Sequence, residues 1–173
     1  KLTLSADNHR FHEPILAPSD FARLTGLSPE MQRLKRNRQE AIMQGVGTRS
    51  ESGRWRYSYF NALTMRVIFE LEAVGWPTIP AVASFSETSS SFWQALRNKV
   101  LNETHPVPEL IMFRRTLSDP SDEQNDNWEF SSKLSEVRSY VGGHFINYEA
   151  LVNQLPNELL IEAKAYLLSQ SGD

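Results

Sequence analysis

Residues 19–38 read SDFARLTGLSPEMQRLKRNR, and the N-terminal part of the chain is organised around them. Apolar residues recur at helical spacing from Phe21 onward, and Gly26 permits the left-handed backbone conformation that ends a helix. Ser28 then offers an N-cap hydroxyl, and Pro29 suits the first turn of a second helix. The stretch therefore predicts two short helices joined by a tight turn, which is a helix-turn-helix outline.

The second of these helices is strongly basic. Four cations fall within six positions, namely Arg33, Lys35, Arg36 and Arg38. The helix is expected to continue to Met43, because Gly45 is the first residue after it that favours a helix end. In a helix-turn-helix unit the second helix is presented outward, so these cations are suited to phosphate groups and base edges.

Charge is unevenly distributed along the chain. The whole sequence has a formal net charge of −3, from 18 Lys and Arg against 21 Asp and Glu. Residues 16–66 hold nine of the basic residues and four of the acids, so they carry +5 while the rest of the chain carries −8. A basic segment joined to an acidic remainder is common where one part binds nucleic acid. Composition alone is equally consistent with charges that form only a solvated surface.

An alternation of cations and aromatics follows the second helix. A polar loop at Thr48–Gly53 leads into RWRYS at residues 54–58, which predicts a short β-ribbon. As a wing, this ribbon would place guanidinium groups on phosphates, while its aromatic rings packed on the helices or lined the groove. The alternative is a hairpin whose aromatics complete a small core. Ser58 is expected to cap a third helix over Tyr59–Val74, where apolar residues recur every three or four positions.

This order of elements over residues 16–85 resembles the winged helix-turn-helix domain of the mercury-resistance-regulator (MerR) family. The matching positions cover the first helix and turn, an arginine that faces DNA, the end of the wing and the helix after it: Phe21, Ala22, Thr25, Gly26, Leu27, Arg33, Arg56, Tyr57, Ser58, Leu63, Leu71 and Gly75. The resemblance implies binding of double-stranded DNA through the second helix and the wing.

The sequence departs from that family in two places. Leu34 and Lys35 stand where the family has aromatic residues. Instead of a long dimerising coiled-coil helix, Pro77, Pro80 and a Ser/Thr run over Ser84–Ser91 interrupt the region after the wing. A dimer is therefore expected to use another surface, and the related fold of phage excisionases stays an alternative.

The expected DNA-binding residues come from the turn, the second helix and the ribbon. They are Ser28, Gln32, Arg33, Lys35, Arg36, Arg38, Arg49, Arg54, Arg56 and Tyr57.

Residues 92–173 predict a small α+β unit for dimerisation or sensing, and residues 1–15 an N-terminal arm. Phe92–Leu101 predicts an amphipathic helix, and three short apolar or aromatic runs at 110–113, 128–130 and 145–146 predict strands, the first two paired. The remaining expectations are an acidic loop at 118–127, a short helix at 134–141 and two final helices at 148–155 and 158–168. The whole chain is thus expected to be a mostly helical α+β protein.

No enzymatic motif appears in the sequence. It has no glycine-rich phosphate loop, nucleophile elbow or helical pair of metal ligands, and neither His105 nor His144 has an orienting acid nearby in sequence. His9 and His12 have no third ligand close by, so ordinary surface histidines are expected there. We therefore expect no catalytic residue, no metal and no cofactor.

Cellular context is indicated by what the composition lacks. There is no cysteine, no apolar stretch of bilayer length and no signal-like start, which favours a soluble cytoplasmic protein. The leading hypothesis is a sequence-specific DNA-binding transcription regulator of bacterial or phage type that acts as a homodimer. The alternatives are a protein-interaction or ligand-sensing module without direct DNA readout, and an excisionase- or packaging-type DNA-binding protein of phage.

Overall fold

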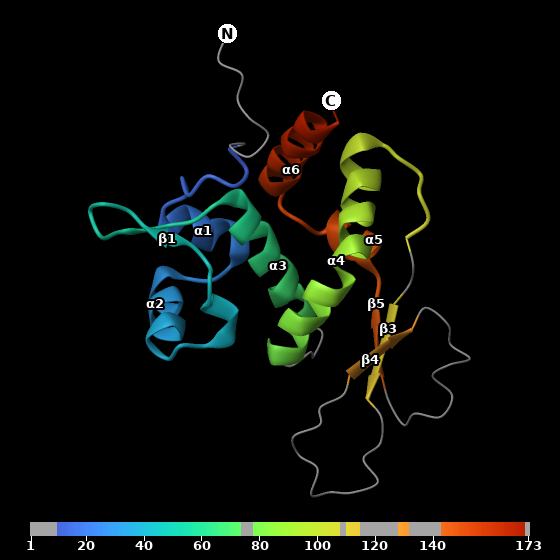
Figure 1. The fold of residues 1–173 in the computed structure, drawn as a ribbon, viewed down its shortest axis with the longest axis horizontal. Coiled ribbons are helices and arrows are strands. Elements are labelled where there is room, and N and C mark those ends of the chain that lie inside the picture. The colour runs from blue at the N-terminus through green and yellow to red at the C-terminus, as the bar shows by residue number, and fades with distance from the viewer. Residues whose placement is uncertain (1–9, 74–77, 108–109, 115–127, 132–142, 172–173) are drawn as a thin grey trace, which may run out of the picture.

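The computed structural model describes residues 10–73, 78–107, 110–114, 128–131 and 143–171. It is a mostly helical α+β fold, as the sequence predicts (Figure 1). The elements in chain order are α1 (Pro18–Thr25), α2 (Pro29–Asn37), a 3-10 helix (Ala41–Met43), β1 (Thr48–Arg49), β2 (Trp55–Arg56), α3 (Tyr59–Ala73), α4 (Thr78–Leu101), β3 (Leu110–Arg114), β4 (Trp128–Ser131), β5 (Gly143–Ile146), α5 (Tyr148–Asn153) and α6 (Asn157–Gln170).

The tight turn between α1 and α2 forms as its residues predict. Gly26 has φ +84°, and its N–H donates to the Ala22 carbonyl at 2.8 Å, which closes α1. The buried Thr25 hydroxyl donates to the Phe21 carbonyl, so α1 ends without an unsatisfied polar group there. The Ser28 hydroxyl accepts from the Met31 N–H at 3.2 Å and caps α2.

The prediction that the second helix continues to Met43 is wrong, because α2 ends at Asn37. Gln39 adopts a left-handed φ of +54°, and its N–H donates to the Arg36 carbonyl. The next N–H, that of Glu40, donates back to the Lys35 carbonyl at 3.0 Å. These two bonds form a Schellman-type helix end on a residue other than glycine. The turn directs Ile42 into the hydrophobic core, where it is buried.

The predicted β-ribbon is present as the antiparallel hairpin β1–β2. Thr48 lies opposite Arg56, and Arg49 lies opposite Trp55. The Ser50 N–H donates to the Arg54 carbonyl at 2.8 Å and closes the loop. Ser58 caps α3 as predicted, since its hydroxyl accepts from the backbone N–H of Asn61 at 3.0 Å.

Helix α3 is the central element and contacts α1, α4 and α6. Its apolar stripe is buried, with Leu63, Val67 and Leu71 almost without exposed surface. In Figure 1, α3 lies between the α1–α2 region on one side and α4 with α5 on the other. Helices α1, α3, α4, α5 and α6 share one hydrophobic cluster that runs from Phe11 to Leu167.

Helix α4 is longer than the sequence predicts. It is continuous from Thr78 to Leu101, so the Ser/Thr run at Ser84–Ser91 does not interrupt it. Serine costs a helix only about half a kcal/mol per residue relative to alanine, and Pro80 falls in the first turn, where proline is tolerated. Burial of Phe92 and Leu96 in the core outweighs that cost. The boundary expected between residues 85 and 92 lies inside this helix.

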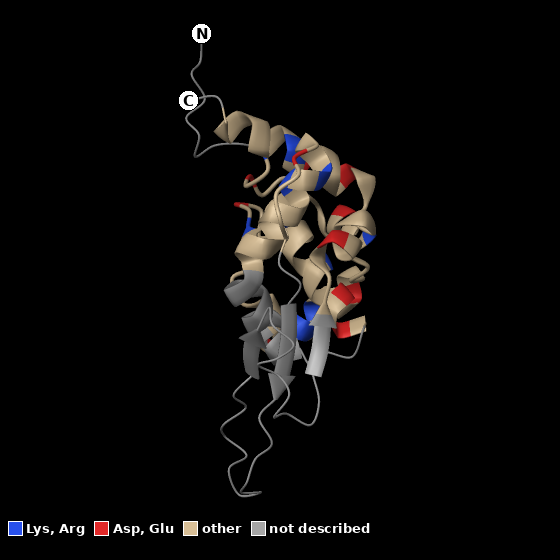
Figure 2. Cartoon of the chain, turned by 90° about the vertical axis from the view of Figure 1, so that its right-hand side faces the viewer, with Lys and Arg blue, Asp and Glu red and all other residues tan. Residues whose placement is uncertain are grey.

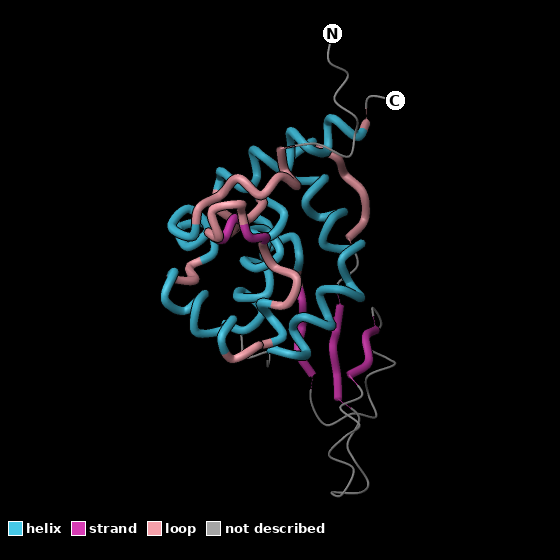
Figure 3. The backbone as a smooth tube through the Cα atoms, turned by 60° about the vertical axis from the view of Figure 1, so that its left-hand side comes forward, coloured by secondary structure: helices cyan, strands magenta, loops and turns pink. Residues whose placement is uncertain are grey.

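The three predicted strands form one antiparallel sheet in the order β4-β3-β5. Met112 of β3 lies opposite Phe130 of β4 and His144 of β5. The sheet extends from one side of the helical body (Figure 3). The loop expected at 118–127 and the helix expected at 134–141 lie outside the described residues.

The two predicted final helices are α5 and α6, and α6 packs against α3 and α4.

Of the expected arm, residues 10–15 are described, and Phe11 is fully buried against the Tyr166 ring at a centroid distance of 4.9 Å. Leu16 and Tyr57 exchange both backbone hydrogen bonds, so the chain before α1 is tied to the hairpin. No helix among the described residues is apolar over a length sufficient to cross a bilayer.

Candidate nucleic-acid interface

A groove of about 570 Å³ lies between α2 and the hairpin. Three arginines line it and no acid does: its walls are Pro18, Pro29, Gln32, Arg33, Arg36, Asn37, Arg49, Gly53, Trp55 and Tyr57. The groove brings together five of the expected DNA-binding residues, namely Gln32, Arg33, Arg36, Arg49 and Tyr57. We call it the α2–hairpin groove.

The hairpin register decides which of its cations faces this groove. Arg49 and Trp55 are cross-strand partners, so their side chains lie on the same face of the ribbon. The Arg49 guanidinium lies 5.4 Å from the centre of the Trp55 ring. Arg56 is paired with Thr48 on the opposite face and does not line the groove.

Helical periodicity places two α2 side chains together on the other wall. Arg33 and Asn37 are four residues apart, so they lie one turn from each other on the same face. Both are exposed. Among the residues that the structure describes, neither side chain has a hydrogen-bond or ion-pair partner.

A buried polar network forms the floor of the groove. The Gln32 amide nitrogen donates to the Pro18 carbonyl at 2.9 Å and to the Leu27 carbonyl at 2.7 Å. The Tyr57 hydroxyl donates to the Gln32 amide oxygen at 2.8 Å. Gln32 is 3% exposed and Tyr57 is 1% exposed, and the Phe21 ring stacks on Tyr57 at 4.0 Å. These two expected DNA contacts thus lie inside the protein, where they join α1, α2 and the hairpin.

Arg36 fastens the hairpin to α2. One of its terminal nitrogens donates to the Val46 carbonyl at 2.6 Å and to the Tyr57 hydroxyl at 3.3 Å. Its guanidinium carbon lies 3.4 Å from the centre of the Trp55 ring, which is a close cation–π contact. Its positive charge therefore sits at the groove, while the nitrogen that donates to Val46 and Tyr57 holds the hairpin.

The remaining expected contacts surround the groove without lining it. The Ser28 hydroxyl is occupied as the cap of α2, and Lys35 is paired with Glu40 at 2.6 Å. Arg38 is exposed at the end of α2, about 140° around the helix axis from Arg33. Arg54 is exposed beside the hairpin loop. The four cations that the sequence places on an outward-facing second helix therefore point in several directions.

The acids of the same region do not neutralise the groove. Glu40 is paired with Lys35, and Asp20, Glu30 and Glu51 are absent from the groove walls. Among the described residues, Arg33, Arg38, Arg49, Arg54 and Arg56 take part in no ion pair. Figure 2, which views the molecule from the side of α4 and α5, shows acidic and basic positions interspersed there.

Arg23 is the cation of this region that binds the acidic C-terminal part. Its guanidinium lies 2.8 Å from a carboxylate oxygen of Glu158 on α6. This hydrogen-bonded pair lowers the pKa of Glu158 below its usual value of 4.5, and the Tyr59 hydroxyl, which donates to the same carboxylate at 3.0 Å, lowers it further. The pair belongs to the packing of α6 on α1 and α3, not to the groove.

Sequence reasoning missed Asn37 as a groove residue. Its signal was its position four residues after Arg33, which puts both on one helical face. Asn37 carries no charge, so the pattern of cations that marks α2 does not include it.

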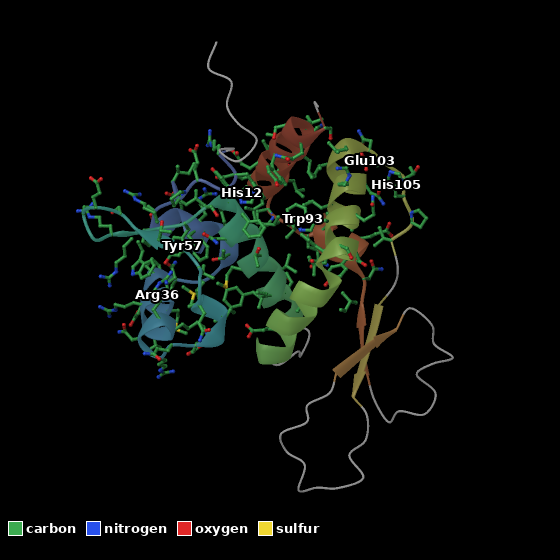
Figure 4. All side chains as sticks on the ribbon, in the orientation of Figure 1. His12, Arg36, Tyr57, Trp93, Glu103 and His105 are labelled. Carbon is green, nitrogen blue, oxygen red and sulfur yellow. The ribbon has the colours of Figure 1, made fainter. Side chains whose placement is uncertain are left out.

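Two histidines outside the groove make contacts within the protein. His12 packs on the rings of Phe60 and Tyr166, at centroid distances of 5.0 and 4.9 Å. The expectation that His105 has no acid nearby is wrong, because its Nε2 lies 3.6 Å from a carboxylate oxygen of Glu103, two residues earlier in the loop after α4 (Figure 4). Arg97 donates two hydrogen bonds to that same carboxylate. Within the described residues, no three metal-ligating side chains gather at one place.

A scan against models of protein families, a search of curated proteins and a search of solved structures each found no match to this chain. Its function is therefore inferred from its own residues and their geometry.

Proposed function

We propose that this chain is a sequence-specific transcription regulator of bacterial or phage type that binds double-stranded DNA. In this proposal α2 enters the major groove, the hairpin acts as a wing along the phosphate backbone, and the chain has no catalytic role. The observation that carries the proposal is the α2–hairpin groove, whose walls hold three arginines and no acid.

The dimensions of α2 suit this role. An α-helix with its side chains is about 10–12 Å across, and the major groove of B-DNA is about 12 Å wide, so α2 can lie in it. The order α1, tight turn, α2 and hairpin supports a winged helix-turn-helix, and the resemblance of the sequence of residues 16–85 to the mercury-resistance-regulator family favours the same orientation.

The hairpin supplies cations for the phosphates. Arg49 faces the groove and Arg54 is exposed beside the loop, and neither has an ion-pair partner within the described residues. Each phosphate contact releases counterions, so affinity should fall steeply with salt. A single unit of this size contacts little DNA, so we infer that two copies bind a two-fold-related site, with the C-terminal part joining them or receiving an effector.

The test measures retention of a random-sequence duplex pool by the full chain as salt is raised. Arg33→Ala and Arg49→Ala should each weaken binding, and Arg49→Ala, which removes a phosphate contact, should lower the slope of log affinity against log salt by about one. Because both side chains are exposed and without internal partners in the described part of the chain, neither change should unfold the protein.

Lys164→Ala is the matched control, since it removes one positive charge from an exposed position on α6. It should leave the salt slope unchanged. The proposal fails if the wild-type chain retains no duplex at low salt, an outcome that would favour the protein-interaction or ligand-sensing module instead. It fails equally if the control weakens binding as much as Arg49→Ala does.

A further inference from the structure

We propose that Arg33 and Asn37 form the base-reading pair of α2 and that they recognise a guanine and an adenine close together in the major groove. This inference rests on the proposed DNA binding and adds the bases and the residues that read them. It starts from the side chains by which α2 lines the α2–hairpin groove: Pro29, Gln32, Arg33, Arg36 and Asn37.

Three of those side chains are unsuited to reading bases, one because it has no donor and two because contacts within the protein hold them. Proline has none, and both amide hydrogens of Gln32 are used on the carbonyls of Pro18 and Leu27. Arg36 is held by Val46, Tyr57 and Trp55 and lies against the hairpin (Figure 4 labels Arg36 and Tyr57). Turning the Arg36 side chain outward would break its hydrogen bonds to Val46 and Tyr57 and its contact with the Trp55 ring.

The two side chains that are left are both exposed and both planar, with paired hydrogen-bonding atoms. A guanidinium forms a bidentate pair with O6 and N7 of guanine, and an asparagine amide does so with N6 and N7 of adenine. Neither Arg33 nor Asn37 has a partner to give up among the described residues, so binding costs no internal contact. The pairing of these residue types on one face therefore favours purine recognition.

Their spacing sets how far apart the two bases can be. Four residues of helix advance about 6 Å, and successive bases on a DNA strand are about 3.4 Å apart. With the helix axis along the groove, the guanine and the adenine should lie within about two base-pair steps.

Base reading and phosphate binding then fall to different residues. Asn37 is neutral, so its removal should change which sequence is bound and leave the salt slope as it was. Arg49 faces the same groove from the hairpin, and its removal should lower affinity for all sequences alike.

The experiment selects bound fragments from random duplex DNA with the full chain and with three variants, Asn37→Ala, Asn37→Gln and Arg49→Ala. The wild-type protein should select a motif with a guanine and an adenine within about two steps. Asn37→Ala should lose the preference for that adenine by roughly 5- to 140-fold, the range that one bidentate base contact supplies. Asn37→Gln should keep it in part, because glutamine offers the same amide, and Arg49→Ala should select the wild-type motif.

Each other outcome identifies which idea fails. If the wild-type chain selects a motif that Asn37→Ala selects unchanged, the base-reading role of Asn37 is wrong while DNA binding stands. If the wild-type chain binds all sequences equally, the base-reading pair and the sequence specificity of the proposed function are both wrong, and only DNA binding by the groove stands. If it binds no DNA at low salt, the proposed function and the base-reading pair fall together. Asn37→Ala should fold normally, since alanine is the better helix former at this exposed position.

Discussion

At the scale of single residues, Gln32 is a buried polar side chain whose hydrogen-bonding groups are all occupied. Its amide makes three hydrogen bonds, to Pro18, Leu27 and Tyr57, which belong to α1, the turn and the end of the hairpin. A buried polar group is tolerated only when such bonds are made, and its loss leaves the partners unsatisfied. The floor of the α2–hairpin groove is therefore held by one neutral residue.

We expect Gln32→Leu to lower the free energy of unfolding by about 3 kcal/mol, because two carbonyls each lose a donor and the Tyr57 hydroxyl loses its acceptor. Urea denaturation followed by circular dichroism measures this. Gln44→Leu, at an exposed position, serves as the matched control and should stay within about 0.5 kcal/mol of the wild type. Equal effects of the two changes would show that the network does not stabilise the fold.

At the scale of elements, the position of the hairpin depends on a close approach at Gly47. Gly47 has φ +76°, and a Cβ added there would lie 2.8 Å from the Arg56 carbonyl oxygen and 2.8 Å from the Tyr57 ring. Only a residue without a side chain lets the chain pass so near to β2. This close approach holds the chain before β1 against the end of β2.

We expect Gly47→Ala to cost roughly 1–3 kcal/mol of unfolding free energy beyond the cost of Gly45→Ala. Gly45 has a similar φ of +71°, but a Cβ there meets no described atom within 4 Å, so it controls for backbone strain alone. Comparison of the two unfolding midpoints in urea isolates the clash. Equal midpoints would mean that β2 can move away from Gly47 without cost.

At the scale of the whole molecule, α6 is tied to the N-terminal part by a group of charged and polar side chains. Glu158 accepts from Arg23 of α1 and from Tyr59 of α3, and Glu162 lies 3.3 Å from Arg10. Arg23 lowers the pKa of Glu158, and burial raises the pKa of Tyr59. The two ends of the chain are thus coupled in one folded unit with a shared core.

This coupling predicts a pH dependence with a definite sign. The pKa of the Glu158 carboxylate is lower in the folded protein than its usual 4.5, so the stability it adds is complete above that value and is lost as the pH falls through the folded pKa. Glu158→Gln should therefore lose less stability than the wild type between about pH 5 and about pH 3.

Urea midpoints measured at several pH values in that window test this expectation. Glu149→Gln is the control, since Glu149 is exposed on α5 and has no ion pair among the described residues. If the urea midpoints of Glu158→Gln and the wild type fall in parallel as the pH is lowered, the predicted role of Glu158 is wrong.

The sequence by itself determined the features that depend on local signals. The Gly26 turn, the Ser28 cap, the apolar stripe of α3 and the alternation that forms β2 are each visible within a few residues, and each is present in the structure. The three strands and the two final helices follow from the same kind of signal. The end of the second helix was predicted wrongly from local signals, because Gln39 takes a left-handed conformation that a glutamine side chain does not favour.

Only the tertiary structure decided which members of the basic segment face outward. Arg33 and Arg36 look alike in sequence, yet Arg36 is held by Val46, ten residues away, and by Trp55 and Tyr57 of the hairpin. Helical periodicity tells which residues share a face, but not what lies opposite that face. That partner is supplied by a segment distant in sequence, which is why the free pair Arg33 and Asn37 could be recognised only once α2 and the hairpin were seen together.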